Sequence, residues 1–295
     1  MYQKLFLSIL AAGLVASACN SIKEDRILCT APVRVSVNGF TVSQEDLPAP
    51  TRATQNVTDV TNIQVLTLAF YSGGTETYKT TQTRGALDEG ETFGVFELSL
   101  PMDSYTMVVI AQGLADGETP IVLTSPTEAT FGDNPTRNLF LTTRTVEIHS
   151  ADAVDISATL NRVTAVFQVK SSDVRTAGAT QIRLTVRDGG KTFDPTSGLA
   201  TSHEGHSRAL SISAAVGEVS TSTIYALLNS DEQDMDVTIE TLDEGQNVLF
   251  TKTIQNVPLK RNRRTILTGA IYTNSSTGGS FQVDPDWPED YNDTF

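Results

Sequence analysis

The chain has 295 residues, of which 39% are hydrophobic, so it is long enough for two average domains or one large β-sandwich and apolar enough to bury a core. The formal charge of −14 disfavours a nucleic-acid partner, because phosphate binding needs the opposite sign. Two Cys and three His leave little material for a disulfide framework or a structural zinc site.

The chain opens with the pattern of a secretory signal peptide. Lys4 precedes an uncharged, apolar run over residues 5–15, which is too short to cross a bilayer as a helix. The run ends in Ala16-Ser17-Ala18-Cys19, and small residues directly before a Cys resemble the bacterial lipobox. We expect residues 1–18 to be removed and Cys19 to carry the lipid. The alternative is an ordinary signal that is cleaved near Ala18.

A lipid on Cys19 would tether the mature protein by its N-terminus. Two or more acyl chains such as palmitate anchor a protein stably, since each buried CH₂ contributes about 0.8 kcal/mol. We expect residues 19–29 to form a lipidated linker. Once Cys19 is used, Cys29 has no partner within the chain, so we expect it to be a small packed or idle thiol.

The remaining sequence is typical of short β-strands. Five segments alternate between hydrophobic and polar residues with a period of two: residues 33–37, 96–100, 163–169, 182–186 and 236–240. Residues 63–70 and 105–111 are more continuously apolar, as central strands often are. Turn sequences such as Asp116-Gly117 and Asp188-Gly189-Gly190 separate the strands. The pattern predicts an all-β fold built of sandwiches rather than a parallel α/β sheet.

We expect two β-sandwich domains, spanning residues 30–150 and 151–280. The connection from Arg187 to Arg208 is long for a β-protein, which indicates a functional or mobile element. Residues 281–295 are acidic and interrupted by Pro, so we expect an exposed acidic tail.

No catalytic, cofactor or metal site can be assembled from the sequence. His203-Glu204-Gly205-His206 does not have the spacing of a helical His-Glu-x-x-His zinc site, so we expect a surface loop. The acids of the tail do not follow the spacing of a calcium loop. The basic cluster Lys260, Arg261, Arg263 and Arg264 fits a charged hairpin turn, with contact to an acidic partner as the alternative. We therefore expect a protein that is not an enzyme and needs no cofactor.

Three segments together resemble the fimbrillin superfamily of Bacteroidetes, whose members build the type V pilus. The stretch from Cys19 to Cys29 is similar to the mature start of the fimbrial anchor subunits, with a lipidated Cys and a second Cys downstream. Residues 160–167 resemble the first strand of the family's second domain. Residues 256–269 resemble its late hairpin, where an Arg-Asn turn leads into a Thr-rich strand that ends in Gly.

This resemblance implies two tandem transthyretin-like, Greek-key β-sandwich domains after a lipoprotein signal peptide. It also implies a surface-exposed lipoprotein of the outer membrane that belongs to a fimbrium and supports cell adhesion. Its partners would be other fimbrial subunits, with host or bacterial surface ligands beyond them. Subunits of this family pair by strand exchange: a sandwich that lacks one strand exposes an apolar groove and unpaired backbone groups, which a neighbour's strand fills.

Two readings stay open within the family. An anchor or minor subunit would keep its first strand, whereas a polymerising shaft or tip subunit would lose it through cleavage between Arg52 and Ala53. The flanking Pro48-Ala49-Pro50 is polar-loop sequence of the kind that tolerates cleavage, although Arg52 also fits an ordinary loop residue. The tail beyond residue 281 does not resemble the long extension that a shaft subunit would donate, which favours the anchor or minor subunit.

A surface glycan-binding lipoprotein is the alternative from another class. Such a module needs aromatic side chains exposed on a rigid face. The sequence has one Trp, Trp287, and its Tyr residues are dispersed, so the fimbrial reading is preferred.

Overall fold

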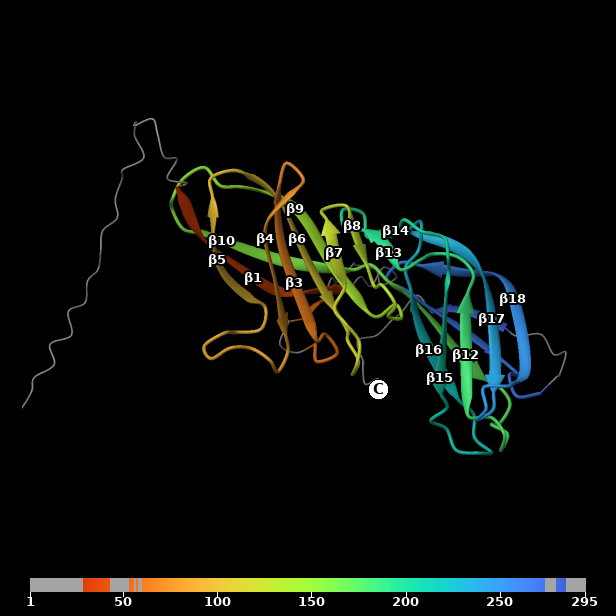
Figure 1. The fold of residues 1–295 in the computed structure, drawn as a ribbon. Helices are drawn as coiled ribbons and strands as arrows, with labels where there is room; N and C mark the ends of the chain where they lie inside the picture. Colours follow the sequence, from red (N-terminus) through yellow and green to blue (C-terminus); the bar gives the residue numbers. More distant parts are fainter. Residues whose placement is uncertain (1–28, 43–52, 56, 58–59, 274–279, 285–295) are drawn as a thin grey trace, which may run out of the picture.

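The computed structural model describes residues 29–42, 53–55, 57, 60–273 and 280–284. Every regular element in these residues is a β-strand, numbered β1 to β20 (Figure 1). The expected all-β fold is confirmed. Within the described part of the chain, we find no helix with the length and hydropathy needed to cross a membrane. The expected signal peptide and residues 19–28 of the expected lipidated linker lie outside the described residues.

The first half of the chain is an 8-stranded sheet that bends around one core. Its order is β2 (Ala53–Gln55), β1 (Thr30–Val42), β10 (Val154–Arg162), β9 (Leu139–Glu147), β6 (Ser104–Gln112), β3 (Val65–Ser72) and β4 (Thr75–Thr83), with β5 (Val95–Pro101) also paired to β1. The corner of the bend lies between β9 and β10, which pair only through Asn161 with Leu141 and Arg162 with Phe140. Side chains from both limbs of the sheet therefore meet in a single cluster, in which the Phe40 and Phe140 rings lie 4.6 Å apart.

The second half packs two sheets of four strands around a second core. One sheet has the order β16 (Thr221–Ala226), β11 (Ala165–Ser171), β19 (Arg264–Gly269) and β20 (Ser280–Asp284). The other has the order β15 (His206–Ser211), β12 (Gln181–Val186), β17 (Glu232–Leu242) and β18 (Val248–Lys260). The alternation of β12 places Ile182, Leu184 and Val186 in this core and turns the residues between them outward.

The expected boundary between residues 150 and 151 is one strand too early. β10 pairs in parallel with β1, and its Ile156, Ala158 and Leu160 belong to the first core. The second core begins at Ala165. The turn residues Ser150 and Asp152 hydrogen-bond to each other, but they connect two strands of the same half. At the other end, residues 281–284 belong to β20 rather than to the expected tail.

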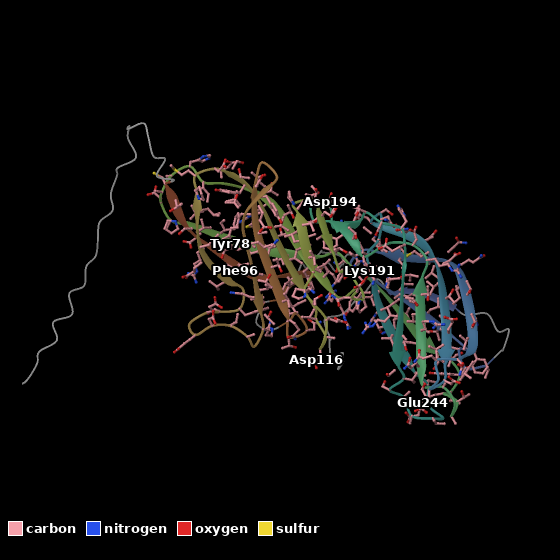
Figure 2. All side chains as sticks on the ribbon, in the orientation of Figure 1. Tyr78, Phe96, Asp116, Lys191, Asp194 and Glu244 are labelled. Carbon is pink, nitrogen blue, oxygen red and sulfur yellow. The ribbon has the colours of Figure 1, made fainter. Side chains whose placement is uncertain are left out.

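A small four-stranded sheet joins the two halves. It has the order β14 (Leu199–Ala200), β13 (Thr192–Asp194), β8 (Glu128–Thr130) and β7 (Val122–Ser125). β7 and β8 come from the connection between β6 and β9, whereas β13 and β14 come from the long connection between β12 and β15. Figure 1 shows these strands between the halves, and Lys191 and Asp194 in Figure 2 mark the segment. The long connection from Arg187 to Arg208 thus holds the halves together through this junction sheet.

A third hydrophobic cluster lies under the junction sheet. It combines Phe131 and Phe193 from the junction with Tyr71, Val108 and Ile110 from the outward face of the first half. The two Phe rings lie 6.2 Å apart, and Phe193 is fully buried. The junction is therefore a packed interface, with backbone pairing between β8 and β13 at its centre.

We expect Phe193→Ala to destabilise the protein by about 3–5 kcal/mol, because it empties a fully buried aromatic site under the junction sheet. Urea unfolding followed by circular dichroism measures this loss. Val122→Ala is the matched control, since Val122 lies in the same sheet but is 53% exposed. Equal stability of the two variants would contradict a packed junction.

Candidate functional site: the slot of the first strand

Strand β1 is bonded to neighbours along both edges. One edge pairs in parallel with β10 from Val33 to Thr41. The other pairs antiparallel with β5 over Thr30–Ser36 and with β2 over Phe40–Val42. Between these two partners, the Val37 backbone N–H donates to the Gly94 carbonyl at 2.7 Å. β1 is therefore an interior strand and not an edge strand. We call the space that it fills, between β10 on one side and β5 and β2 on the other, the slot of β1.

The inward face of β1 forms part of the first core. Ala31, Val33, Val35, Val37 and Phe40 are all buried. A bulge between Val37 and Gly39 shifts the alternation by one residue, and this shift directs Phe40 inward. Full burial of such side chains contributes about 1.5–3 kcal/mol each. Without β1, the slot would be an apolar groove with unpaired backbone groups on β10 and on β5.

The predicted processing site lies beside this slot. Arg52 is outside the described residues, and Ala53 is the first residue of β2, in register with Val42 of β1. The covalent link from β1 to β2 runs through residues 43–52. A cut between Arg52 and Ala53 would separate the strands in sequence and leave all of β2 with the body of the protein.

Cys29 differs from its expected role. It is disulfide-bonded, so the prediction of an idle thiol is wrong. Its carbonyl accepts a hydrogen bond from the Met102 N–H at 3.2 Å, directly before β1 begins. Cys19, the predicted lipid attachment, lies outside the described residues. Because the sequence has only two cysteines, an internal disulfide and a thioether on Cys19 compete for one sulfur atom.

The two His residues of the predicted surface loop have different surroundings. The exposed His203 ring contacts the Asp188 carboxylate at 2.8 Å. His206 is instead 8% exposed at the start of β15, so the expectation of a surface loop is wrong at this residue. Burial lowers the pKa of His206 to about 4, aided by the charges of Lys191 and Arg208. No group of three or more His, Cys, Asp or Glu residues that could hold a metal lies in the described ranges.

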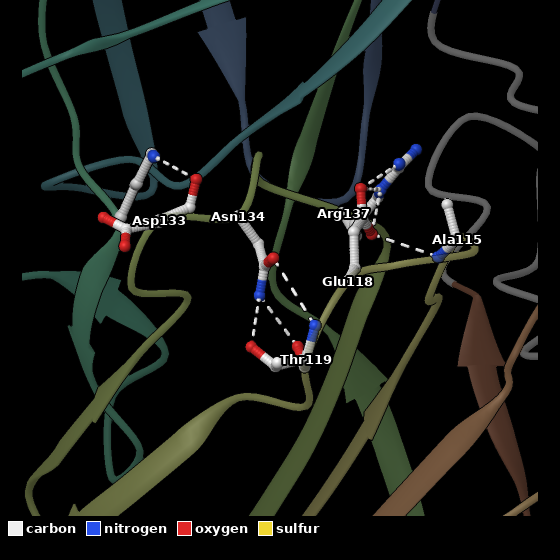
Figure 3. A network of polar contacts seen from close by, with 7 residues as sticks. Ala115, Glu118, Thr119, Asp133, Asn134 and Arg137 are labelled. Atoms are coloured by element: carbon white, nitrogen blue, oxygen red, sulfur yellow. Dashed lines mark hydrogen bonds and ion pairs between the residues drawn. The ribbon is translucent and has the colours of Figure 1, made fainter.

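A buried ion pair fixes the connections that lead into the junction sheet (Figure 3). The Arg137 guanidinium binds both carboxylate oxygens of Glu118, which also accepts the Ala115 N–H at 3.0 Å. Burial alone would raise the pKa of Glu118, but these hydrogen bonds hold it below its usual value. Asn134 bonds to the Thr119 carbonyl at 2.8 Å and so ties the same two connections together. No motif in the sequence indicates that Arg137 pairs with Glu118, because 19 positions separate them.

Residues 32–294 match a family described as a family of unknown function, DUF6562. The chain belongs to this family. Among curated proteins, none matches.

Several solved structures are similar to the chain at low sequence identity. A candidate adhesin from Bacteroides ovatus is 11% identical, with a TM-score of 0.50 over 81% of this chain and 88% of that one. The fimbrial anchor protein Mfa2 from Porphyromonas gingivalis is 13% identical, with a TM-score of 0.46 over 86% and 95%. A fimbrial assembly protein from Parabacteroides distasonis is 14% identical, with a TM-score of 0.40 over 86% and 98%. At 11% identity, the first of these likenesses shows a shared fold.

We expect Val35→Asp to destabilise the protein by about 3 kcal/mol, because it places a carboxylate at a fully buried position of β1. The adjacent Arg34→Asp is the matched control, since Arg34 points outward and its guanidinium lies 4.0 Å from the Glu97 carboxylate, with both side chains exposed. Thermal unfolding measures both variants. If Val35→Asp melts like Arg34→Asp, then β1 does not occupy the slot.

The free energy of unfolding should fall as the pH is lowered from 6.5 to 4, because protonation of His206 favours the unfolded chain. The unfolded chain binds this proton at the ordinary pKa of 6.5, whereas the folded protein resists it until about pH 4. At 1.36 kcal/mol per unit, the loss approaches about 3 kcal/mol. We expect His206→Gln to flatten this part of the pH profile of the unfolding free energy. His203→Gln, at an exposed ring, is the matched control; equal profiles for both variants would contradict the role of His206.

Proposed function

We propose that this protein is a component of a cell-surface fimbrium, held at the outer membrane as a lipoprotein, and that it acts as an anchor or minor subunit. It pairs with other subunits by β-strand exchange and supports cell adhesion. The role needs no catalytic group and no cofactor. The observation that carries the proposal is the slot of β1, whose occupant is bonded at both edges and contributes five buried residues to the core.

The slot has the properties that strand exchange requires. Its two backbone edges bind any extended strand through main-chain hydrogen bonds, and its alternating apolar positions select the register. A donor strand would have to present apolar residues where β1 presents Val33, Val35 and Val37. The fold that the chain shares with a candidate adhesin is compatible with this role.

The polymerising subunit is the alternative within this proposal. Cleavage between Arg52 and Ala53 would detach β1 together with everything before it and open the slot for a neighbour's strand. In the anchor, β1 stays in place and the lipid stays attached. The position of Ala53 does not distinguish the anchor from the polymerising subunit. A cut before Ala53 would leave β2 intact in either case.

Peptide mapping of the mature N-terminus by mass spectrometry tests the proposal. The protein is recovered both from outer membranes and from filaments sheared off the cell surface. We expect a start at an acylated Cys19 in the membrane fraction, where the thioether on Cys19 takes the place of a disulfide between Cys19 and Cys29. A start at Ala53 in the filaments would make the chain a polymerising subunit.

One further outcome would sink the proposal. This is an unmodified Cys19 in a disulfide with Cys29, together with the absence of the protein from both fractions. Such a protein would have neither a membrane anchor nor a filament, and a glycan array would then test the surface-glycan alternative. An Arg52→Gln variant is the matched control for processing, because it removes the cleavage residue without touching the described strands.

A further inference from the structure

The sheet of the first half ends in two open edges that border one groove. β4 pairs only with β3, and β5 pairs only with β1. Both strands are fully described, and no backbone hydrogen bond joins one to the other. A groove with a volume of about 500 Å³ lies between them, and we call it the seam groove. Figure 2 labels Tyr78 from β4 and Phe96 from β5, which both line it.

A buried glutamine fixes one end of the seam groove. The Gln82 amide donates to the Val95 carbonyl at 2.8 Å, and its Oε1 accepts the Gly94 N–H at 2.8 Å. A side chain here bridges the distance between β4 and β5 that backbone pairing would otherwise close. Arg84 holds the start of the same connection by donating to the Ile63 carbonyl at 2.9 Å. The spacing of the two strands is therefore set before any ligand binds, which lowers the cost of binding.

The core of the first half reaches the surface along the seam groove. Tyr78 of β4, Leu98 of β5 and Leu87 of the connection between them pack against this core but are only partly buried. Their neighbours in the strands, Lys79 and Glu97, are exposed. An extended segment between β4 and β5 would cover apolar side chains on its inner face and meet water on its outer face. This is the environment that the alternation of a β-strand fits.

The directions of β4 and β5 suit an inserted strand. Followed through the sheet, the pairs β4–β3, β3–β6, β6–β9, β9–β10 and β1–β5 are antiparallel, and β10–β1 is parallel. β4 and β5 therefore run in opposite directions. A strand between them would be antiparallel to one and parallel to the other, as β1 is between β5 and β10. Such a strand would pair the open backbone groups of both edges.

The charges of the seam groove favour a basic occupant. Its charged lining residues are Arg34, Asp88, Glu91 and Glu97. One cation and three acids leave a charge of −2 (1 − 3 = −2). Arg34 neutralises Glu97 only weakly, because their charged groups are 4.0 Å apart and both side chains are exposed. A second copy of this chain, with a charge of −14, is repelled by such a groove, whereas a segment rich in Lys or Arg is attracted.

We propose that the seam groove binds a basic, extended peptide segment of another protein as an additional strand between β4 and β5. The segment presents apolar side chains to Tyr78 and Leu98 and places Lys or Arg beside Glu97. β1 stays in its slot. This inference does not depend on the fimbrial role, because binding here requires neither the release of β1 nor a lipid anchor.

Isothermal titration calorimetry of the full chain with a synthetic peptide tests the proposal. The probe is Lys-Val-Thr-Val-Lys-Val-Thr with both ends blocked, so that only its Lys side chains are charged. We expect saturable binding that added salt weakens, since screening reduces the attraction. The same peptide with alternate backbone nitrogens methylated keeps its charge but cannot pair as a strand, and it should not bind. Absence of binding by the first peptide, or equal binding by the methylated one, would overturn the proposal.

A charge reversal in the groove tests the contribution of its acids. Glu97→Lys should weaken peptide binding about tenfold, because it replaces an attraction with a repulsion. Glu147→Lys is the matched control, since it makes the same change at an exposed residue of β9, which β6 and β3 separate from β4. Both residues are exposed, so both variants keep the fold. Equal affinity of the two variants for the peptide would overturn the proposal.

Hydrogen exchange followed by mass spectrometry locates the bound peptide. We expect the backbone N–H groups of β4 and β5 to exchange more slowly when the peptide is present, with β1 and β10 unchanged. A change along β1 and β10 instead would place the peptide in the slot of β1 and overturn the proposal. A dimer in light scattering that Glu97→Lys dissociates would also overturn it, because the occupant of the seam groove would then be a second copy of the chain.

Discussion

Backbone pairing between β8 and β13 is the constraint on which the arrangement of the two halves depends. Each strand sits on an excursion from its own half, and neither excursion could bury its apolar side chains alone. Phe131 and Phe193 become buried only when the strands meet over the outward face of β3, β6 and β9. Such an interface couples burial of apolar area to hydrogen bonding, so it forms as a unit. A polar pocket lined by Arg162 and Arg261, and the ion pair of Arg137 with Glu118, both depend on this contact.

The slot of β1 places a kinetic condition on strand exchange. A border strand can leave by losing one row of hydrogen bonds, whereas β1 is bonded to β10 on one edge and to β5 and β2 on the other. Its departure also exposes the core face formed by Val33 and Val35. Exchange without a covalent cut would therefore require partial unfolding of the first half. Under the proposed function, either β1 is removed before a donor strand arrives, or it stays and the subunit ends a filament.

The sequence allowed good prediction where a strand has one wet face and one buried face. The alternation in residues 33–37 and 182–186 corresponds to β1 and β12, whose burial alternates in the same way. The pattern failed where long-range contacts decide the outcome. Ser150 and Asp152 have the chemistry of a boundary turn, yet β10 returns to pair with β1, and no local signal encodes a parallel partner. The burial of His206 likewise depends on the packing of distant strands and not on its neighbours in the sequence.

In the candidate site, too, local pattern was predictable from the sequence and long-range contacts were not. The apolar face of β1 was visible in the sequence, but its position between two neighbours was not. Arg162 was not grouped with the basic cluster at Lys260, because 98 positions separate them (260 − 162 = 98) and only the junction brings them to one pocket. Charge patterning identifies a cluster along the chain, whereas a binding site is defined by what the fold brings together.

Topology explains why β1, and not its counterpart in the second half, is suited to exchange. Each half pairs its first strand in parallel with a strand late in that half, β1 with β10 and β11 with β19. β11 follows β10 after only Val163 and Thr164, so it cannot leave without breaking the link between the halves. Its partner β19 is also covered on the other edge by β20, whereas β10 pairs with β9 only at its last two residues. Release of β1 therefore leaves the chain beyond it continuous and opens an edge on β10, which in the proposed function a strand from another subunit would fill.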